Sequence, residues 1–413
     1  MKKFLAMILA LVMSLSLVAC GGSKEETKPT EEKPTEEPAG TEEPAEAASD
    51  YAVAMITDYG DITDQSFNQT TYEACKEYCE ANGINFNYFK PAGDSTGERV
   101  AMIEKAVDEG YNIMVMPGFA FAGAVVEAAS DYPDVKFVVL DVAKGDYLAE
   151  GVAAAGESYD YQPDNWDLEK YVDLSNVYTV VYQEELCGYM AGYAAVKLGY
   201  THLGFLGGMA VPAVVRYGYG FVQGADAAAA DAGVDVTVEY AYGNQFFGDA
   251  DITAYMDNWY QTLGVQAVFA CGGGIYVSAA EAAAKVGGKV IGVDTDQAGI
   301  IDAYGEGMTI TSAMKGLAAS TKDALKQIIE DDNWNSLAGQ IVNLGLVSGD
   351  DPEANFVQIP MESTQWSDGF TQDDYKALVK DMFDGKITVS NDITAEPASL
   401  ATTATVNAYG NIK

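Results

Sequence analysis

The chain has 413 residues and is strongly acidic, with 62 Asp and Glu, 23 Lys and Arg, and a formal net charge of −39. Because such a chain repels phosphate backbones, we expect no nucleic-acid partner. The single histidine, His202, argues against catalytic triads and against metal sites that need several imidazoles. We expect neither a metal nor a cofactor.

The amino-terminal region is typical of an exported chain. Two lysines precede an apolar run that ends in Leu17-Val18-Ala19-Cys20, and we interpret residues 1–19 as a signal peptide. Residues 20–49 are rich in Glu, Lys, Pro and Thr and predict a disordered acidic tether. The residues before Cys20 resemble a bacterial lipobox. The resemblance implies a lipid on Cys20 and a place at the cell membrane, on its extracytoplasmic face. The alternative is an ordinary secretory signal with a chance cysteine.

From Tyr51 the chain alternates short apolar runs with amphipathic stretches. The first group of expected strands covers residues 52–57, 84–89, 113–116 and 136–140. The helices expected between them cover residues 67–82, 98–109 and 121–130. Such alternation predicts right-handed crossovers and a parallel sheet. A polar, Tyr-rich stretch, residues 145–176, then interrupts the pattern, and we interpret it as an insertion.

The alternation resumes after this stretch. Further strands are expected at residues 177–182, 202–206, 236–240, 267–270, 290–293 and 308–312. Further helices are expected at residues 184–198, 214–232, 250–263, 276–286 and 317–332. Two tandem sets of strand-helix units predict two α/β lobes. The last seventy residues are less regular, and only residues 371–384 predict a helix.

Four cysteines follow Cys20, and all of them lie in apolar surroundings: Cys75, Cys79, Cys187 and Cys271. Cys75 and Cys79 are four residues apart on an expected helix, which is a poor arrangement for an unstrained disulfide. We therefore expect buried thiols rather than a disulfide framework.

Polar residues follow the expected strands, and ligands of open parallel sheets bind beyond the carboxyl ends of the strands. The residues found there include Asp64, Asp141, Gly273, Asp294 and Lys315. These groups suit ligand hydroxyls and ring nitrogens better than phosphate. As alternatives, Asp64 or the nearby Ser66 would cap the following helix, and the triple glycine around Gly273 would be a turn of close approach.

Five motifs, in chain order, resemble those of the basic membrane lipoproteins, the substrate-binding components of ABC importers that include a purine nucleoside receptor. They are Asp64-Gln65-Ser66-Phe67-Asn68-Gln69, Gly207-Gly208-Met209, Arg216-Tyr217-Gly218-Tyr219-Gly220-Phe221, Gly292-Val293-Asp294-Thr295-Asp296-Gln297 and Thr311-Ser312-Ala313-Met314-Lys315. The resemblance covers residues 51–345. Gly218 and Gly274 depart from it, because the family pattern has a glutamate and a threonine there.

The resemblance implies a type I periplasmic-binding-protein fold, in which two doubly wound parallel-sheet lobes are joined by three crossing segments and hold a ligand cleft between them. Residues 50–183 and 298–342 are then expected to form lobe 1. Residues 184–297 and 343–413 are expected to form lobe 2 and a carboxyl-terminal tail. The implied partners are a nucleoside, above all a purine nucleoside, and an ABC permease.

The resemblance also implies roles for single residues. Phe67 corresponds to a base-stacking aromatic, with Asn68 and Asp141 as polar partners. Asp294 corresponds to a ribose-binding carboxylate, and Lys315 to a lysine near the sugar. A second aromatic would come from Phe246 or Phe247, and the sequence does not decide between them. The expected ligand-binding set is completed by Asp64, Arg216 and Gly273.

Three other functions stay open. The same fold would hold a sugar or another small polar metabolite, with Arg216 and the carboxylates as the main contacts. A sensory module without transport is a second alternative. A secreted hydrolase that uses Asp294 and Asp296 is a third, and it is disfavoured because neither a general-base histidine nor a nucleophile motif accompanies the two carboxylates.

Overall fold

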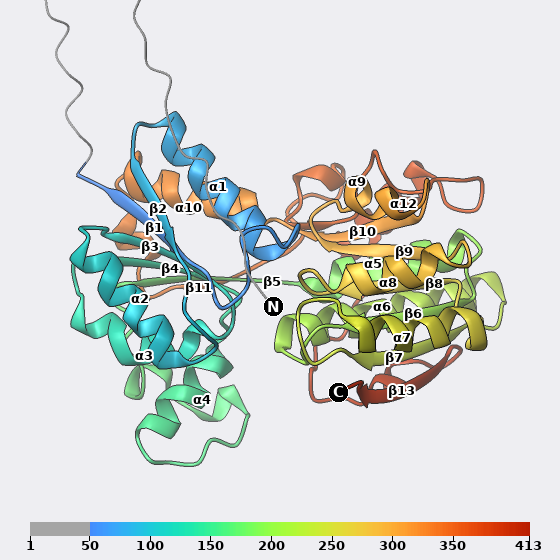
Figure 1. The fold of residues 1–413 in the computed structure, drawn as a ribbon, viewed down its shortest axis with the longest axis horizontal. Coiled ribbons are helices and arrows are strands. Elements are labelled where there is room, and N and C mark those ends of the chain that lie inside the picture. The colour runs from blue at the N-terminus through green and yellow to red at the C-terminus, as the bar shows by residue number, and fades with distance from the viewer. Residues whose placement is uncertain (1–49) are drawn as a thin grey trace, which may run out of the picture. The chain divides into compact units, whose positions relative to one another are not determined.

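The computed structural model describes residues 50–413 (Figure 1). The expected signal peptide, the expected tether and Cys20 lie outside the described residues. Within the described part, no helix combines the length and the apolar composition that crossing a membrane requires.

The first lobe contains a six-stranded sheet. Its strands are β1 (Ala52–Ile56), β2 (Asn85–Phe89), β3 (Ile113–Pro117), β4 (Lys136–Leu140), β5 (Val177–Tyr182) and β11 (Ile341–Leu344). They follow the order β11-β5-β4-β3-β1-β2, and every neighbouring pair is parallel. The main helices of this lobe are α1 (Phe67–Ala81), α2 (Thr96–Asp108), α3 (Phe121–Ala128), α4 (Lys144–Ala154), α10 (Leu317–Ile329) and the short α11 (Trp334–Leu337). β3 and β5 are buried along their whole length, as expected for strands covered on both faces.

The second lobe contains a seven-stranded sheet. Its strands are β6 (His202–Gly207), β7 (Thr237–Tyr242), β8 (Ala267–Cys271), β9 (Lys289–Asp294), β10 (Thr309–Lys315), β12 (Val357–Gln358) and β13 (Thr405–Asn411). They follow the order β12-β10-β9-β8-β6-β7-β13, with β12 antiparallel to β10. The main helices of this lobe are α5 (Glu184–Lys197), α6 (Pro212–Ala232), α7 (Ala250–Asn258), α8 (Tyr276–Ala284), α9 (Ala298–Ile301) and α12 (Gln372–Phe383).

The strand β10 corrects one expected boundary. Residues 298–342 were expected to lie in lobe 1, but β10 pairs in parallel with β9 and therefore belongs to the second sheet. The chain returns to the first lobe only with α10, which packs against α1. The pattern of residues 308–312 predicts a strand correctly but carries no information on which sheet that strand joins.

The chain crosses between the lobes after β5, between β10 and α10, and after β11. Backbone hydrogen bonds tie these crossings together. The amide of Gln183 donates to the carbonyl of Leu344 at 2.9 Å, and the amide of Gly316 donates to Phe356 at 2.7 Å. The amide of Phe356 in turn donates to Gly345 at 3.1 Å. The three crossings therefore form one bonded junction.

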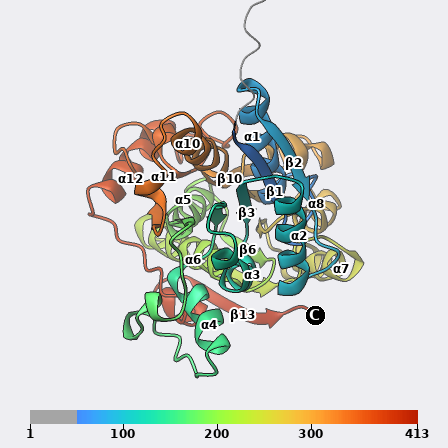
Figure 2. The same cartoon turned by 90° about the vertical axis from the view of Figure 1, so that its left-hand side faces the viewer.

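Two regions differ from the sequence expectation. The expected insertion contains the helix α4, whose residues Tyr147 and Val152 are buried; Figures 1 and 2 show it below the rest of the first lobe. The tail adds β13 beside β7, where Tyr409 donates to the buried Glu239 at 2.6 Å. β13 is largely exposed, so it lacks the apolar run that marks a strand in sequence.

The helices α5 and α6 touch backbone to backbone. Gly188 and Gly192 on α5 face Gly220 and Gly224 on α6. A Cβ atom at any of these four positions would lie 2.0–2.2 Å from a carbonyl oxygen of the opposite helix. Only glycine permits this approach, which holds residues 185–192 of α5 against residues 217–224 of α6.

Replacing Gly220 by Ala is expected to lower the free energy of unfolding by about 3 kcal/mol, because the new methyl group overlaps the carbonyl oxygen of Glu185. Gly97, on α2, is a matched control, because no atom lies within 4 Å of the position of its added Cβ. Gly97→Ala is expected to leave stability unchanged or to raise it by up to about 1 kcal/mol. Urea unfolding of both variants tests this, and equal effects would contradict the close helix contact.

Candidate ligand-binding site

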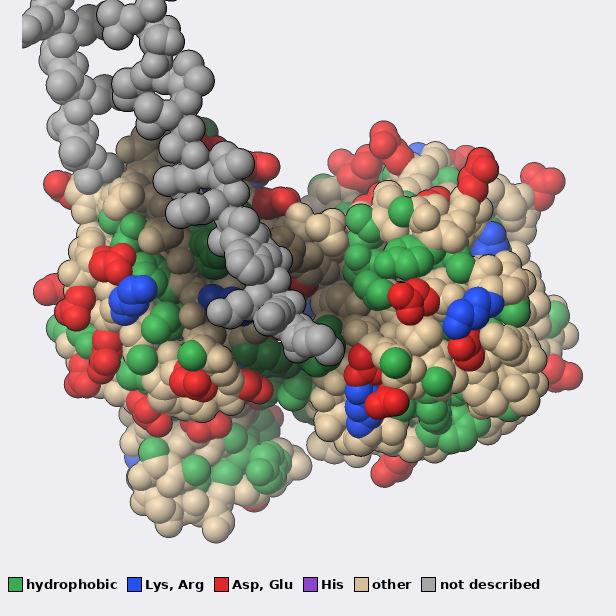
Figure 3. Space-filling view, viewed as in Figure 1, with side chains coloured by type: hydrophobic (Ala, Val, Ile, Leu, Met, Phe, Trp, Pro, Cys, Tyr) green, Lys and Arg blue, Asp and Glu red, His purple; other side chains and the backbone are tan. Residues whose placement is uncertain are grey.

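A cavity of about 380 Å³ lies between the lobes, at the carboxyl ends of the strands of both sheets. Nine of the ten expected ligand-binding residues line it: Asp64, Phe67, Asn68, Asp141, Phe246, Phe247, Gly273, Asp294 and Lys315. Arg216 does not line it. Figure 3 shows that acidic side chains are spread over the visible face of both lobes and that basic ones are fewer.

The start of α1 shows which side chain caps this helix. The Asp64 carboxylate accepts hydrogen bonds from the backbone amides of Ser66 and Asn68 at 2.9 Å and of Gln69 at 3.1 Å. Asp64 is therefore the cap, and burial raises its pKa. Ser66 makes no capping bond and instead donates to Asp294 of the other lobe at 2.7 Å.

Asp141 and Asp294 occupy equivalent places in the two lobes. Asp141 directly follows β4, and Asp294 ends β9, the strand at the corresponding position of the second sheet. Both residues have left-handed backbone conformations, with φ of 64° and 66°. Such conformations are uncommon for residues other than glycine and turn the chain sharply at the strand end. The two buried carboxylates thus enter the cavity from opposite sides.

Lys315, the last residue of β10, lies between these carboxylates. Its Nζ is 2.5 Å from Asp141, 3.3 Å from Glu184 and 3.8 Å from Asp294. Burial alone would lower the pKa of Lys315, but the three carboxylates raise it above its usual value. Lys315 is therefore a charged, fully paired cation. Its Nζ also lies 4.8 Å from the centre of the Phe67 ring.

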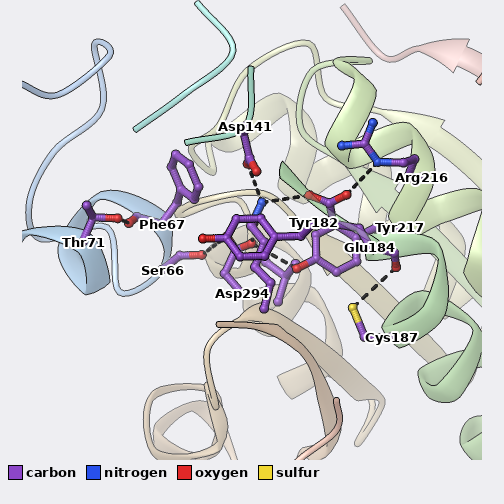
Figure 4. A network of polar contacts seen from close by, with 12 residues as sticks. Ser66, Phe67, Thr71, Asp141, Tyr182, Glu184, Cys187, Arg216, Tyr217 and Asp294 are labelled. Atoms are coloured by element: carbon purple, nitrogen blue, oxygen red, sulfur yellow. Dashed lines mark hydrogen bonds and ion pairs between the residues drawn. The ribbon is translucent and has the colours of Figure 1, made fainter. Parts of the chain in front are cut away.

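Arg216 supports this cluster from outside the cavity. Its Nε donates to Glu184 at 2.7 Å, and Glu184 bonds to Lys315 through its other oxygen. Figure 4 shows the resulting chain of contacts from Arg216 to Asp141. Sequence reasoning missed Glu184, because the first residue of an expected helix gives no sign of where its side chain points.

Two adjacent glutamates have opposite protonation behaviour. Burial would raise the pKa of Glu184, but Arg216 and Lys315 together bring it below the usual value. Burial and the neighbouring Glu184 raise the pKa of Glu185 to about 7. Within the described residues, Glu185 Oε2 is buried without a hydrogen-bond partner. Glu184 therefore stabilises the fold as a carboxylate, whereas Glu185 destabilises it when ionised.

The two aromatic candidates differ in position. The Phe246 ring packs against Gly208 and Gly272, where an added Cβ would lie 2.3 Å and 2.8 Å from a ring atom. Its centroid is 6.4 Å from that of Tyr59 in the other lobe. Phe247 is 57% exposed. The glycines of this turn thus give Phe246 its place inside the cleft.

Several residues lining the cavity were not among the expected ones, including Asp58, Tyr59, Lys90, Phe119, Tyr217 and Cys271. Asp58 follows β1, and its carboxylate accepts from the amides of Tyr59 and Gly60 at 2.7 Å each. Its position after a strand was a usable signal for this site. The position of Tyr217 beside Arg216 offered no comparable signal.

Comparison with known proteins assigns the chain to a family. Residues 51–350 match the family described as "ABC transporter substrate-binding protein PnrA-like". The chain belongs to this PnrA-like family. Its members are binding proteins of ABC transporters rather than enzymes, and they act outside the cytoplasm.

Individual relatives of this PnrA-like protein are distant. The "ABC transporter nucleoside-binding protein BmpA" of Lactococcus lactis is 26% identical over 60% of this chain and 65% of its own length, just under two thirds. An uncharacterized lipoprotein of Pyrococcus abyssi is 24% identical over 74% of this chain and 69% of its own. A solute-binding protein structure from Aeropyrum pernix K1 has a TM-score of 0.59 and 21% identity, and covers 85% of this chain and 90% of that one. The expected fold class is confirmed.

The family assignment makes this PnrA-like protein a binding protein and removes the hydrolase alternative. The Asp296 carboxylate, which that alternative required, accepts from the amide of Ala298 and from Ser363 and does not line the cavity. Within residues 50–413, no group of three or more metal-ligating side chains is found. The four described cysteines are buried free thiols, as expected.

At pH 8, Glu185→Gln is expected to raise the free energy of unfolding by about 1–3 kcal/mol. The pKa of Glu185 is about 7 in the folded chain, above its ordinary value of 4.5. The stability that this carboxyl contributes is therefore complete below pH 4.5 and lost as the pH rises through 7, so the gain should be much smaller at pH 5 than at pH 8.

Glu184→Gln is the matched control. It is expected to cost about 3 kcal/mol at pH 7, because Arg216 and Lys315 lose a buried partner. Urea unfolding at pH 5, 7 and 8 measures both variants. A Glu185→Gln variant with the pH profile of the wild type would contradict the assignment.

Proposed function

We propose that this protein captures a nucleoside, above all a purine nucleoside, and delivers it to an ABC permease. The observation that carries the proposal is the set of groups around the cavity: the aromatic ring of Phe67, the carboxylates of Asp141 and Asp294, and the paired Lys315. In this arrangement a flat base meets an aromatic face while sugar hydroxyls meet carboxylate oxygens. Buried polar contacts of this kind give specificity.

The base is held between Phe67 of the first lobe and Phe246 of the second. Phe246 is preferred to Phe247 because it packs inside the cleft against Gly208 and Gly272, whereas Phe247 is largely exposed. Asn68 supplies a polar contact beside the base. Its Oδ1 is buried and has no partner among the described residues, so a donor on the ligand would satisfy it.

The charges around the cavity favour a nucleoside over a nucleotide. Both lysines that line it are already paired, Lys315 with Asp141 at 2.5 Å and Lys90 with Asp61 at 2.8 Å. A phosphate would therefore meet carboxylates without a free cation, and its burial would be costly. Arg216 is paired with Glu184 and does not line the cavity, so a sugar held by Arg216 and the carboxylates would lack one of its main contacts.

Contacts across the cleft suggest how binding is signalled. Ser66 donates to Asp294, and Gln297 Nε2 donates to the carbonyl of Gln65 at 3.0 Å. A ligand that bridges the lobes adds to these contacts and shifts the equilibrium towards the closed form, which the permease recognises. A lipid on Cys20 would keep the protein near that permease, and a relative named as a lipoprotein supports this part of the proposal.

Isothermal titration calorimetry of residues 50–413 with adenosine, guanosine and inosine is expected to give binding heat with at least one of them. Free ribose is expected to bind at least a hundred-fold more weakly, because it lacks the base that the aromatic rings hold. AMP serves as the charged control and is expected to bind more weakly than adenosine. No heat with any of the nucleosides would overturn the proposed ligand.

Phe67→Ala, Phe246→Ala and Asp294→Asn are each expected to weaken nucleoside binding at least ten-fold, because each removes a contact to base or sugar. Phe247→Ala and Asp296→Asn are matched controls, the first more exposed and the second outside the cavity lining, and should change the Kd less than three-fold. Calorimetry measures all five variants. Wild-type affinity in the first three would show that the ligand binds elsewhere.

A further inference from the structure

Tyr217 is a buried, rigidly held wall of the cavity. It lies in the second turn of α6, and its side chain is 1% exposed. Its ring meets that of Phe269 edge to face at 6.0 Å, and Lys315 Nζ lies 5.6 Å from its centroid. Its carbonyl oxygen is in the close contact with Gly188, where an added Cβ would lie 2.2 Å away. The Tyr217 hydroxyl therefore has a fixed position.

That hydroxyl forms a hydrogen bond with the proposed sugar-binding carboxylate. It donates to Asp294 Oδ1 at 3.3 Å, while Ser66 donates to Asp294 Oδ2 at 2.7 Å (Figure 4). A phenol has one proton and two lone pairs, so Tyr217 gives its proton to Asp294 and keeps its lone pairs as acceptors. Burial raises the pKa of Tyr217 well above its usual value, so the hydroxyl stays protonated.

A carboxylate usually accepts two adjacent sugar hydroxyls with its two oxygens. Here Ser66 donates to one oxygen of Asp294 and Tyr217 to the other, so fewer lone pairs of this carboxylate remain for a ligand. The oxygen of Tyr217, which keeps its lone pairs, is a further acceptor beside this carboxylate on the cavity wall. Two neighbouring hydroxyls of a ligand would then donate one to Asp294 and one to Tyr217.

We propose that Tyr217 is a specificity-determining residue, whose phenol oxygen and the Asp294 carboxylate together accept the two hydroxyls of a vicinal diol. The inference rests on the proposed nucleoside function and sharpens it: the ligand is a ribonucleoside, and its deoxy analogues are rejected. A sugar without one of the hydroxyls leaves a buried acceptor unpaired, which is the physical cause of the rejection.

The test compares three ligands by calorimetry: the ribonucleoside that binds best and its 2′-deoxy and 3′-deoxy analogues. The wild type is expected to bind at least one deoxy analogue ten-fold or more weakly than the ribonucleoside. Tyr217→Phe is expected to lose about ten-fold in affinity for the ribonucleoside but less than two-fold for that analogue, so that the discrimination nearly disappears.

Tyr240→Phe is the matched control. Its hydroxyl is also buried in the second lobe and bonded, to Tyr242 at 2.9 Å, but Tyr240 does not line the cavity, so discrimination should match the wild type. Equal weakening of all three ligands by Tyr217→Phe, or no change, would overturn the inference while leaving the nucleoside function standing. Absence of binding to the wild type by all three would overturn both.

Discussion

One buried cation, Lys315, connects the parts of this protein on which binding depends. It ends a strand of the second sheet and pairs with Asp141 of the first lobe and with Glu184, which lies directly after the first crossing. Taking such charges out of water is costly and is offset only while the partners stay close. The cluster therefore couples the relative position of the lobes to the shape and charge of the cavity wall.

The second determinant is steric. The glycine contact between α5 and α6 brings Glu184, the first residue of α5, and Arg216, in the second turn of α6, within 2.7 Å of each other. The same contact sets Tyr217 against Asp294. Gly218, which departs from the family pattern, is under a similar steric constraint, because an added Cβ would lie 2.2 Å from the hydroxyl of Tyr240. Backbone packing far from the surface thus decides which side chains reach the cavity.

Much of the fold and of the cavity lining could be predicted, because both follow from local pattern. Apolar runs marked the central strands, and Asp141 and Asp294 stood directly after two of them, where parallel sheets bind ligands. Which distant side chains pair with each other could not be predicted. Arg216 lies in a recognisable motif, yet its partner Glu184 is 32 residues away and neither residue lines the cavity. The lobe to which β10 belongs and the existence of the exposed strand β13 could not be predicted either, because both depend on contacts that no local pattern encodes.

The three crossings have a consequence for the order in which the protein can become complete. Neither lobe is a continuous stretch of chain: the first sheet lacks an edge until β11 has been synthesised, long after β5, which it borders. The second sheet is complete only after β13, which is synthesised later still, pairs with β7. Unfinished edges of both sheets thus coexist during translation, and the early strands must stay soluble beside them. The high density of acidic side chains, which repel one another between nascent chains, is suited to that interval.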